Sequence, residues 1–204
     1  MKKMSALILA LALCAAPAFA EAAPQPSPEA AFAPTDSTIL VACFSATGNT
    51  WSLAEYAAEF LNAALFRIEP EIPYTEADLN YGDSASRANQ EMNDETSRPA
   101  LKATVENIEQ YDTILLGFPI WWGQAPRLIE TFVEAHDLSG KTILPFCTSG
   151  SSGYGQTGEI LAALTDETVT WLEGRRFPAS ATAEEIAAWL QEMAIEPYAP
   201  SEEE

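Results

Sequence analysis

Runs of apolar residues recur along the chain and alternate with segments of helical character. Near-continuous stretches of Val, Ile and Leu are typical of strands that are buried on both faces of a parallel sheet. Five such stretches are present, and the fifth is the weakest. We predict strands at residues 38–44, 64–69, 112–118, 141–147 and 168–172.

Between these strands, apolar residues recur every three to four positions, which is the period of an amphipathic helix. After the first strand the pattern includes Leu53, Ala57 and Leu61. The last helix begins at a possible capping box formed by Thr182 and Glu185. Such alternation predicts an α/β fold, in which helices cover both faces of a parallel sheet. Three further helices are expected at residues 101–109, 126–135 and 156–164.

Residues 70–100 do not fit this alternation. They are polar, irregular and bounded by prolines, with one possible helical turn around residues 87–93. We expect a long excursion from the sheet at this point.

The first 20 residues have the layout of a secretory signal peptide. Two lysines precede an apolar stretch at residues 6–15, and an Ala-x-Ala end follows at residues 18–20. A buried helix and a membrane anchor are the alternatives, but the stretch is too short to span a bilayer. Lipid attachment at Cys14 is a minority interpretation because the bulky Leu13 precedes it. We therefore expect export to the periplasm or the cell exterior.

The remaining chain divides into a linker, a domain and a tail. Residues 21–37 are rich in proline and alanine, which favours a disordered linker. Residues 198–204 form an acidic tail, and residues 38–197 are long enough for one domain with its own core.

The formal net charge is −20. Loss of the first 20 residues would remove two lysines and no acidic residue, so the remaining chain would be still more negative. Such an excess argues against binding to nucleic acid or anionic membranes, since both repel it. Solubility and an acidic docking surface for a basic partner explain the charge equally well. Only Cys43 and Cys147 would remain after leader removal, too few for a disulfide scaffold.

In an open parallel sheet, ligands bind beyond the carboxyl ends of the strands. The loop after the first strand holds small and polar residues without any charge, directly before a helix. A helix N-terminus offers unpaired N–H groups, and hydroxyl and amide side chains add donors for a phosphate. An ordinary cap needs only one such residue, and the lysine-containing phosphate loop of nucleotide hydrolases is absent. The candidate phosphate ligands are Ser45, Ala46, Thr47, Gly48, Asn49 and Thr50.

The loop after the third strand carries two adjacent tryptophans. Aromatic faces at this edge could stack on a planar ring. The alternative is that both rings fill the core, although adjacent residues rarely bury in the same way. The candidate ring-binding residues here are Pro119, Ile120, Trp121, Trp122 and Gly123.

The loop after the fourth strand is rich in glycine and hydroxyl residues. Its backbone groups could recognise the edge of a heterocycle, and its tyrosine could cover a face. The G-x-S-x-G motif of serine hydrolases is not met, and the chain has a single histidine. The candidates are Thr148, Ser149, Gly150, Ser152, Gly153, Tyr154 and Gly155.

Together, S-x-T-G-N-T, P-I-W-W-G-Q-A-P and T-S-G-S-S-G-Y-G resemble the three cofactor loops of the flavodoxin family, and are most similar to its exported bacterial branch. The resemblance covers Thr38 to about Met193. It implies a doubly wound five-stranded parallel sheet of order 2-1-3-4-5. It also implies flavin mononucleotide (FMN) as cofactor, with the first loop on the phosphate and the other two beside the isoalloxazine ring.

The resemblance implies electron transfer outside the cytoplasm, with a redox partner protein or a small-molecule electron acceptor. An FMN-dependent quinone or small-molecule reductase is the alternative, which the long segment at residues 70–100 could serve. A third class is a binding protein without redox use. No catalytic side chain and no metal ligand are assigned.

Three further residue predictions follow. The implied strand order separates Cys43 and Cys147 by two strand steps, roughly 10 Å, beyond disulfide reach. We therefore predict two buried free thiols. Arg127 is interpreted as a cation on a helix surface, and His136 as a structural residue.

Overall fold

The computed structural model describes residues 38–197. The predicted signal peptide at residues 1–20, the linker at residues 21–37 and the tail at residues 198–204 lie outside this range. Within the described domain, no helix combines the length and apolar character needed to cross a membrane.

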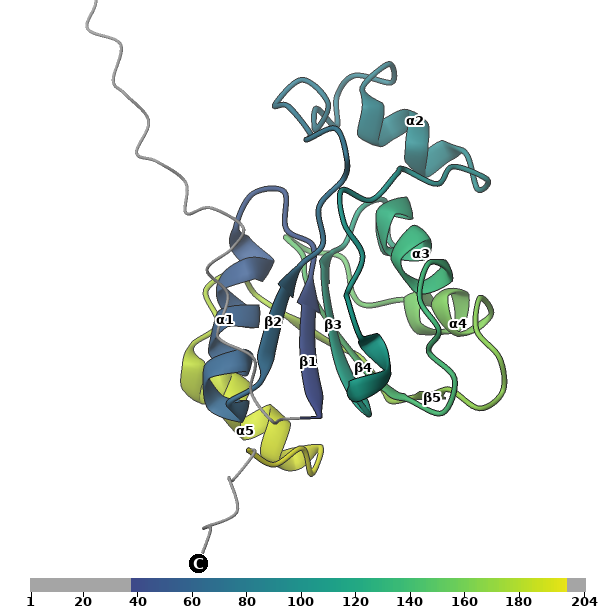
Figure 1. Ribbon diagram of the computed structural model, residues 1–204. Coiled ribbons are helices and arrows are strands. Elements are labelled where there is room, and N and C mark those ends of the chain that lie inside the picture. The colour runs from purple at the N-terminus through teal and green to yellow at the C-terminus, as the bar shows by residue number, and fades with distance from the viewer. Residues whose placement is uncertain (1–37, 198–204) are drawn as a thin grey trace, which may run out of the picture.

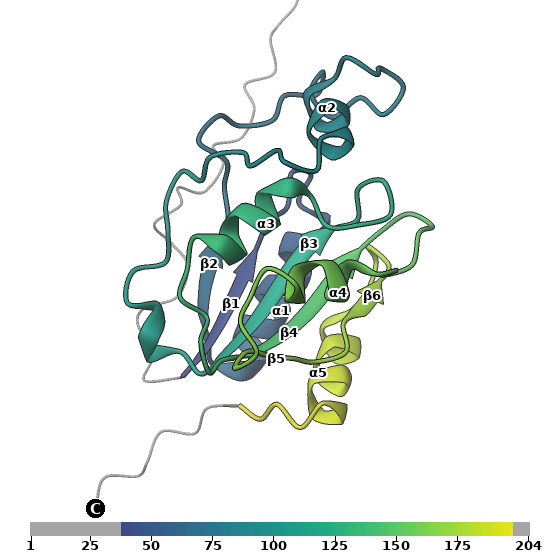
Figure 2. The same ribbon diagram turned by 90° about the vertical axis from the view of Figure 1, so that its right-hand side faces the viewer.

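The centre of the molecule is a parallel sheet of order β2-β1-β3-β4-β5, as the resemblance implies (Figure 1). A sixth strand, β6, also pairs in parallel with β4, beyond the end of β5 (Figure 2). The strands are β1 Ile39–Cys43, β2 Ala64–Arg67, β3 Thr113–Pro119, β4 Thr142–Thr148, β5 Thr170–Trp171 and β6 Arg175–Phe177.

Helices cover both faces of the sheet. Helices α1 and α5 lie together on one face, and α3 and α4 lie on the other (Figures 1 and 2). The capping box of α5 is present, with Thr182 and Glu185 each bonding the other's backbone. The bounds are α1 Asn49–Leu61, α2 Arg87–Asn93, α3 Arg127–Glu134, α4 Thr157–Ala162 and α5 Ala183–Glu192.

Alternate residues of the central strands supply two cores. Val41 and Cys43 face α1 and α5, whereas Leu40 and Ala42 belong to the cluster around α3. Cys147 belongs to the cluster around α3, so the two buried cysteines lie on opposite faces of the sheet. Both are free thiols. The prediction of two buried free thiols is therefore confirmed.

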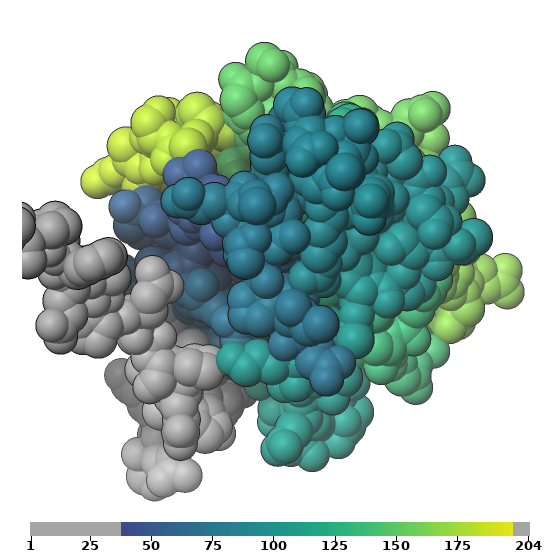
Figure 3. All heavy atoms as spheres, turned by 90° about the horizontal axis from the view of Figure 1, so that it is seen from above, coloured from purple at the N-terminus to yellow at the C-terminus, as the bar shows by residue number. Residues whose placement is uncertain are grey.

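Helix α2 lies away from the sheet, above α3 (Figures 1 and 2). It is the centre of the excursion, residues 70–100, and coincides with the predicted helical turn. Seen from above, the excursion covers much of this end of the molecule (Figure 3).

The prediction of a helix at residues 101–109 is wrong. Only a short 3₁₀ turn forms there, at Ile108–Gln110. Leu101 forms an isolated antiparallel bridge with Pro70, and the Lys102 N–H donates to the Glu69 carbonyl at 2.9 Å. The start of this segment is therefore held extended by the chain that leaves β2, and tertiary pairing overrides its local pattern.

The fifth predicted strand, residues 168–172, is shorter than expected, and β6 was missed. The two pieces are separated at Gly174, where a β-carbon would lie 2.3 Å from the ring of Tyr154. The edge of the sheet is thus interrupted at a position where an aromatic ring packs against backbone.

Candidate functional site

A hollow of about 370 Å³ opens beyond the carboxyl ends of β3 and β4, beside the start of α1. This volume lies within the usual range for small-molecule sites, roughly 300 to 1,000 Å³. All three predicted loops contribute to it. The wall of this main hollow consists of Thr47, Asn49, Tyr81, Pro119, Ile120, Trp121, Thr148, Ser149, Gly150, Arg176, Pro178 and Ala179.

The start of α1 is arranged to receive an anion. Its N-cap is Gly48, which has φ of 88° and provides no side-chain cap, and its first turn contains no acidic residue. The Thr50 N–H donates to Ser45 Oγ at 3.2 Å. The positive end of the helix dipole is therefore not compensated by a carboxylate from its own first turn.

Thr50 ties this loop to the end of β4. Its hydroxyl is fully buried and lies 2.7 Å from the Thr148 hydroxyl. Since either oxygen can donate, one hydroxyl proton of the pair stays available for a third partner. The pair sets the distance between the phosphate loop and the loop after β4.

The two tryptophans lie on a tight turn with unusual backbone geometry. Trp121 and Gln124 exchange backbone hydrogen bonds at 2.9 and 3.1 Å. Trp122 and Gly123 between them both have positive φ, 46° and 84°, as in a type I′ turn. Glycine accepts this conformation without cost, whereas tryptophan is strained in it.

This turn sends the two indole rings in different directions. Trp121 is 5% exposed and makes edge-to-face contacts with Phe44 and Tyr74 at centroid distances of 5.5 and 5.2 Å. Trp122 is 37% exposed and stacks on Tyr81 at 4.2 Å. Trp121 lines the main hollow and Trp122 does not; that at least one tryptophan lines the cofactor site stays a prediction.

The third loop approaches the second. A β-carbon on Gly155 would lie 3.2 Å from the Gly123 carbonyl oxygen, so the two backbones are in close contact. Thr148, Ser149 and Gly150 line the main hollow. Ser152, Gly153 and Gly155 are exposed residues farther along the loop, and the Ser149 hydroxyl donates to the Ser152 carbonyl.

Tyr154 points inward and does not line the main hollow. Its ring packs against Gly158 and Gly174 and lies 6.4 Å from that of Phe118. Among residues 38–197 its buried hydroxyl has no hydrogen-bond partner. That Tyr154 covers a cofactor face stays a prediction.

Sequence reasoning missed Tyr81 and Arg176. Tyr81 is exposed and comes from the excursion, where no periodic pattern marked it. Arg176 lies on β6, and its Nη2 donates to the carbonyl oxygens of Ser149 at 2.7 Å and Gly150 at 3.4 Å. The short run R-R-F between Gly174 and Pro178 was the available signal, because glycine and proline commonly bound short strands.

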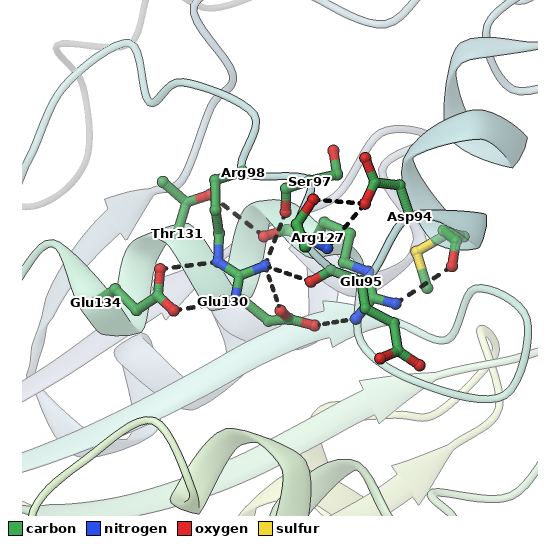
Figure 4. A network of polar contacts seen from close by, with 10 residues as sticks. Asp94, Glu95, Ser97, Arg98, Arg127, Glu130, Thr131 and Glu134 are labelled. Atoms are coloured by element: carbon green, nitrogen blue, oxygen red, sulfur yellow. Dashed lines mark hydrogen bonds and ion pairs between the residues drawn. The ribbon is translucent and has the colours of Figure 1, made fainter.

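Ion pairs hold the excursion against α3 (Figure 4). The buried carboxylate of Glu130 pairs with Arg127 at 2.5 Å and with Arg98 at 2.8 Å. Arg98 also pairs with Glu134 at 2.8 Å, and Arg127 donates to the Met92 carbonyl at the end of α2 at 3.3 Å. The interpretation of Arg127 as a surface cation is wrong, because the excursion covers it and Glu130 neutralises it.

A second group of contacts joins α2 to the wall of the main hollow. The Tyr74 hydroxyl donates to Glu91 at 2.6 Å, and Arg87 pairs with the same carboxylate at 2.6 Å. Burial, and then the hydrogen bond to Glu91, raise the pKa of Tyr74 well above its ordinary value. Tyr74 is therefore neutral where it contacts Trp121.

Comparison with known proteins identifies the family. The flavodoxin family model matches residues 38–193. The chain belongs to the flavodoxin family. None of the curated proteins matches it.

Solved structures agree with this assignment. A candidate flavoprotein from Bacteroides eggerthii has 44% identity and a TM-score of 0.72, over 78% of this chain and 98% of its own. Another from Bacteroides uniformis has 42% identity and a TM-score of 0.72, over 76% and 98%. A flavoprotein from Lactobacillus acidophilus in complex with FMN has 18% identity and a TM-score of 0.56, over 68% and 91%, and shares the fold.

FMN is the cofactor of this flavodoxin, and the main hollow fits it. The start of α1, whose first turn contains no acidic residue, is chemically suited to the phosphate. Thr148 and Thr50 offer hydroxyls next to that position. Trp121 and Tyr81 offer aromatic surface for the ring, and Ser149 and Gly150 offer backbone groups for its edge.

Proposed function

We propose that this flavodoxin is an exported FMN protein that transfers electrons outside the cytoplasm. The observation that carries the proposal is the chemistry of the main hollow, where residues 38–197 contribute no His, Cys, Asp, Glu or Lys to the wall. Burial raises the pKa of Tyr81, so its hydroxyl stays protonated. Because no wall residue can exchange a proton near neutral pH, the reactive chemistry belongs to the cofactor.

The chain's own residues have three tasks in this proposal. Bound FMN supplies the capacity to accept and release electrons. The start of α1 binds the phosphate through oriented N–H groups and the hydroxyl of Thr50. Trp121 and Tyr81 exclude water from the ring, and the loop at residues 148–155 orients it.

Export is the part of the proposal that rests on residues 1–20, whose pattern is that of a signal peptide. The acidic excess suits a basic redox partner protein, since opposite charges accelerate association. A small-molecule electron acceptor is the other partner class. Cell fractionation of the full chain, with N-terminal sequencing of the product, tests export: a cytoplasmic protein that retains residues 1–20 would contradict it.

The electron-transfer proposal is tested with the purified chain. We expect a yellow protein that binds FMN with one site per chain, is reduced by dithionite, and passes electrons to a one-electron acceptor protein without releasing the flavin. A colourless protein that ignores added FMN would exclude electron transfer and favour a binding protein without redox use.

An FMN-dependent quinone or small-molecule reductase is the second candidate, and one observation favours it. Tyr81 brings the excursion into the wall of the main hollow, so this segment can shape access for a second ligand. Rapid NAD(P)H oxidation that requires an added quinone would support the reductase. The absence of such turnover, with intact transfer to protein acceptors, would support the first candidate.

A further inference from the structure

Two arginines at the cofactor end of the sheet have no carboxylate partner within residues 38–197, Arg67 and Arg176. The guanidinium of Arg67 lies 3.7 Å above the Trp51 ring and lines a separate hollow of about 190 Å³. Arg176 lines the main hollow. The other arginines of this range, Arg87, Arg98, Arg127 and Arg175, all pair with glutamates.

The backbone of Arg176 is fixed in the sheet, and its guanidinium is fixed by the loop that follows β4. Its backbone pairs with β4, where Cys147 is its register partner. Its Nη2 donates to the Ser149 and Gly150 carbonyls in the loop that continues β4. These hydrogen bonds hold the partly exposed guanidinium in the wall of the main hollow.

Arg176 also has unused binding capacity. Its Nε is buried and has no hydrogen-bond partner among the described residues. Carbonyl oxygens accept hydrogen bonds but carry no formal charge, so the positive charge is not neutralised by them. Arg176 is only partly exposed, and a positive charge without a carboxylate partner in the wall of a ligand hollow is available to interact with the ligand.

We propose that Arg176 tunes the reduction potential of the bound flavin by favouring its reduced form. This inference rests on the proposed function, because it requires FMN to be bound and reduced in the main hollow. Each electron that the flavin accepts without a proton adds one negative charge. The electrons come from an external reductant such as dithionite, and a cation in the wall stabilises the added charge.

The ring is favoured over the phosphate as the group that Arg176 faces. Its hydrogen bonds go to the loop expected to flank the ring, whereas the phosphate is expected at the start of α1. Charge effects fall with distance and are screened by salt outside the hollow. One cation in the wall therefore opposes the effect of carboxylates on the distant surface.

The test compares Arg176→Gln and Arg176→Met with the wild type and with Arg175→Gln. Arg175 is a matched control, because it is the preceding residue of β6 and its charge pairs with the exposed Glu192 at 3.0 Å. For each protein, the two-electron midpoint potential is measured with FMN and with riboflavin, and the affinities for both oxidised ligands are measured in parallel.

Both neutral variants are expected to weaken binding of the reduced flavin, relative to the oxidised flavin, by about tenfold, which lowers a two-electron potential by about 30 mV. FMN and riboflavin should show the same shift, since the effect is on the ring. Arg175→Gln should leave the potential unchanged, and Arg176→Lys, which keeps the charge, should restore most of it.

The outcomes separate the possibilities. Unchanged potentials in the neutral variants would overturn the inference and leave the proposed function intact. Loss of FMN affinity without loss of riboflavin affinity, at constant potential, would make Arg176 a phosphate ligand and would also overturn it. A wild-type chain that binds neither flavin would contradict the proposed function itself. Since two neutral variants are used, misfolding of one does not prevent the measurement.

Discussion

Thr50 shows how one hydroxyl can serve both the fold and the cofactor. The sequence places it at the end of the phosphate loop, and the structure buries it against Thr148 at 2.7 Å. A hydroxyl that bonds a neutral neighbour can still donate to a phosphate oxygen if the neighbour provides the proton between them. Thr50 is therefore a candidate phosphate ligand and a link between α1 and β4.

Thr50→Ala is expected to weaken FMN binding by about 10- to 150-fold, because a hydrogen bond to a charged group contributes roughly 1.5 to 3 kcal/mol. Riboflavin lacks the phosphate, so its affinity should hardly change. Flavin fluorescence titration measures both dissociation constants.

Thr182→Ala is the matched control for Thr50→Ala. It removes the hydroxyl that accepts from the Glu185 N–H at the start of α5, away from the main hollow. Loss of such a cap typically costs about 1 kcal/mol of stability, and FMN affinity should be unchanged. Equal losses of FMN and riboflavin affinity in Thr50→Ala would show that Thr50 only supports the helix.

His136 is a structural residue in this geometry. Its Nδ1 bonds the Phe132 carbonyl at 2.7 Å, and its Nε2 accepts from the Val105 N–H at 2.9 Å. Both bonds require a neutral ring with the proton on Nδ1. Burial lowers the pKa of His136 below its ordinary value.

This histidine predicts a pH dependence of stability. The unfolded chain binds the proton more readily than the folded one, so the free energy of unfolding should fall as pH decreases below about 6.5. The slope from this residue cannot exceed about 1.4 kcal/mol per pH unit. In His136→Gln the contribution of the histidine to the pH dependence of the free energy of unfolding should disappear, while the contribution of the carboxylates remains. Denaturant unfolding of both proteins between pH 7.5 and pH 5.5 measures the difference, and identical slopes would contradict the assignment.

The excursion is the element that most changes the site relative to the sequence prediction. It brings Tyr81 onto Trp122 and packs Tyr74 against Trp121. The ion pairs of Glu130 fasten it to α3 (Figure 4). A segment that reads as an irregular loop is therefore a fixed part of the wall.

Glu130→Gln is expected to destabilise the protein far more than Glu134→Gln. Both residues bond Arg98, but Glu130 is 4% exposed and Glu134 is 39% exposed. Removing one partner of a buried ion pair typically costs about 3 to 5 kcal/mol, whereas an exposed pair contributes about 1 kcal/mol or less.

Thermal and denaturant unfolding of the two variants measure these costs. Hydrogen exchange of α2 then shows whether the excursion loosens in Glu130→Gln before the sheet does, as we expect from its place in the network. Comparable stability losses in both variants would mean that burial of the Glu130 carboxylate does not control the anchoring.

The central strands and three loops could be predicted because their signals are local. Buried apolar runs locate β1, β3 and β4, and the polar residues after each run locate the loops. The prediction of a short helix at residues 101–109 was wrong because Leu101 forms a bridge with Pro70, a residue far away in the sequence. Arg127 was misjudged because the excursion covers it. Tyr81 was missed because the excursion brings it to the wall of the main hollow. Arg176 required the register of β6 on β4, which no periodicity shows.

At the scale of the whole molecule, two electrostatic influences oppose each other. The formal net charge of −20 disfavours added electrons. A carboxylate about 10 Å from the ring, at an effective dielectric constant near 40, contributes about 0.8 kcal/mol, or roughly 35 mV for a one-electron step. Arg176 in the wall of the main hollow acts in the opposite direction. Salt screens the surface carboxylates more strongly than it screens Arg176.

The midpoint potential of the wild type is therefore expected to rise with ionic strength. The Debye length falls from about 30 Å at 0.01 M salt to about 3 Å at 1 M, which screens surface carboxylates from the flavin. Salt screens Arg176 less, since it lies in the wall of the main hollow beside the ligand. The difference in potential between wild type and Arg176→Gln should then stay nearly constant while both potentials rise. Spectroelectrochemical titration at the two salt concentrations measures this. A wild-type potential that falls with salt would mean that nearby cations, and not the acidic surface, dominate the field at the ring.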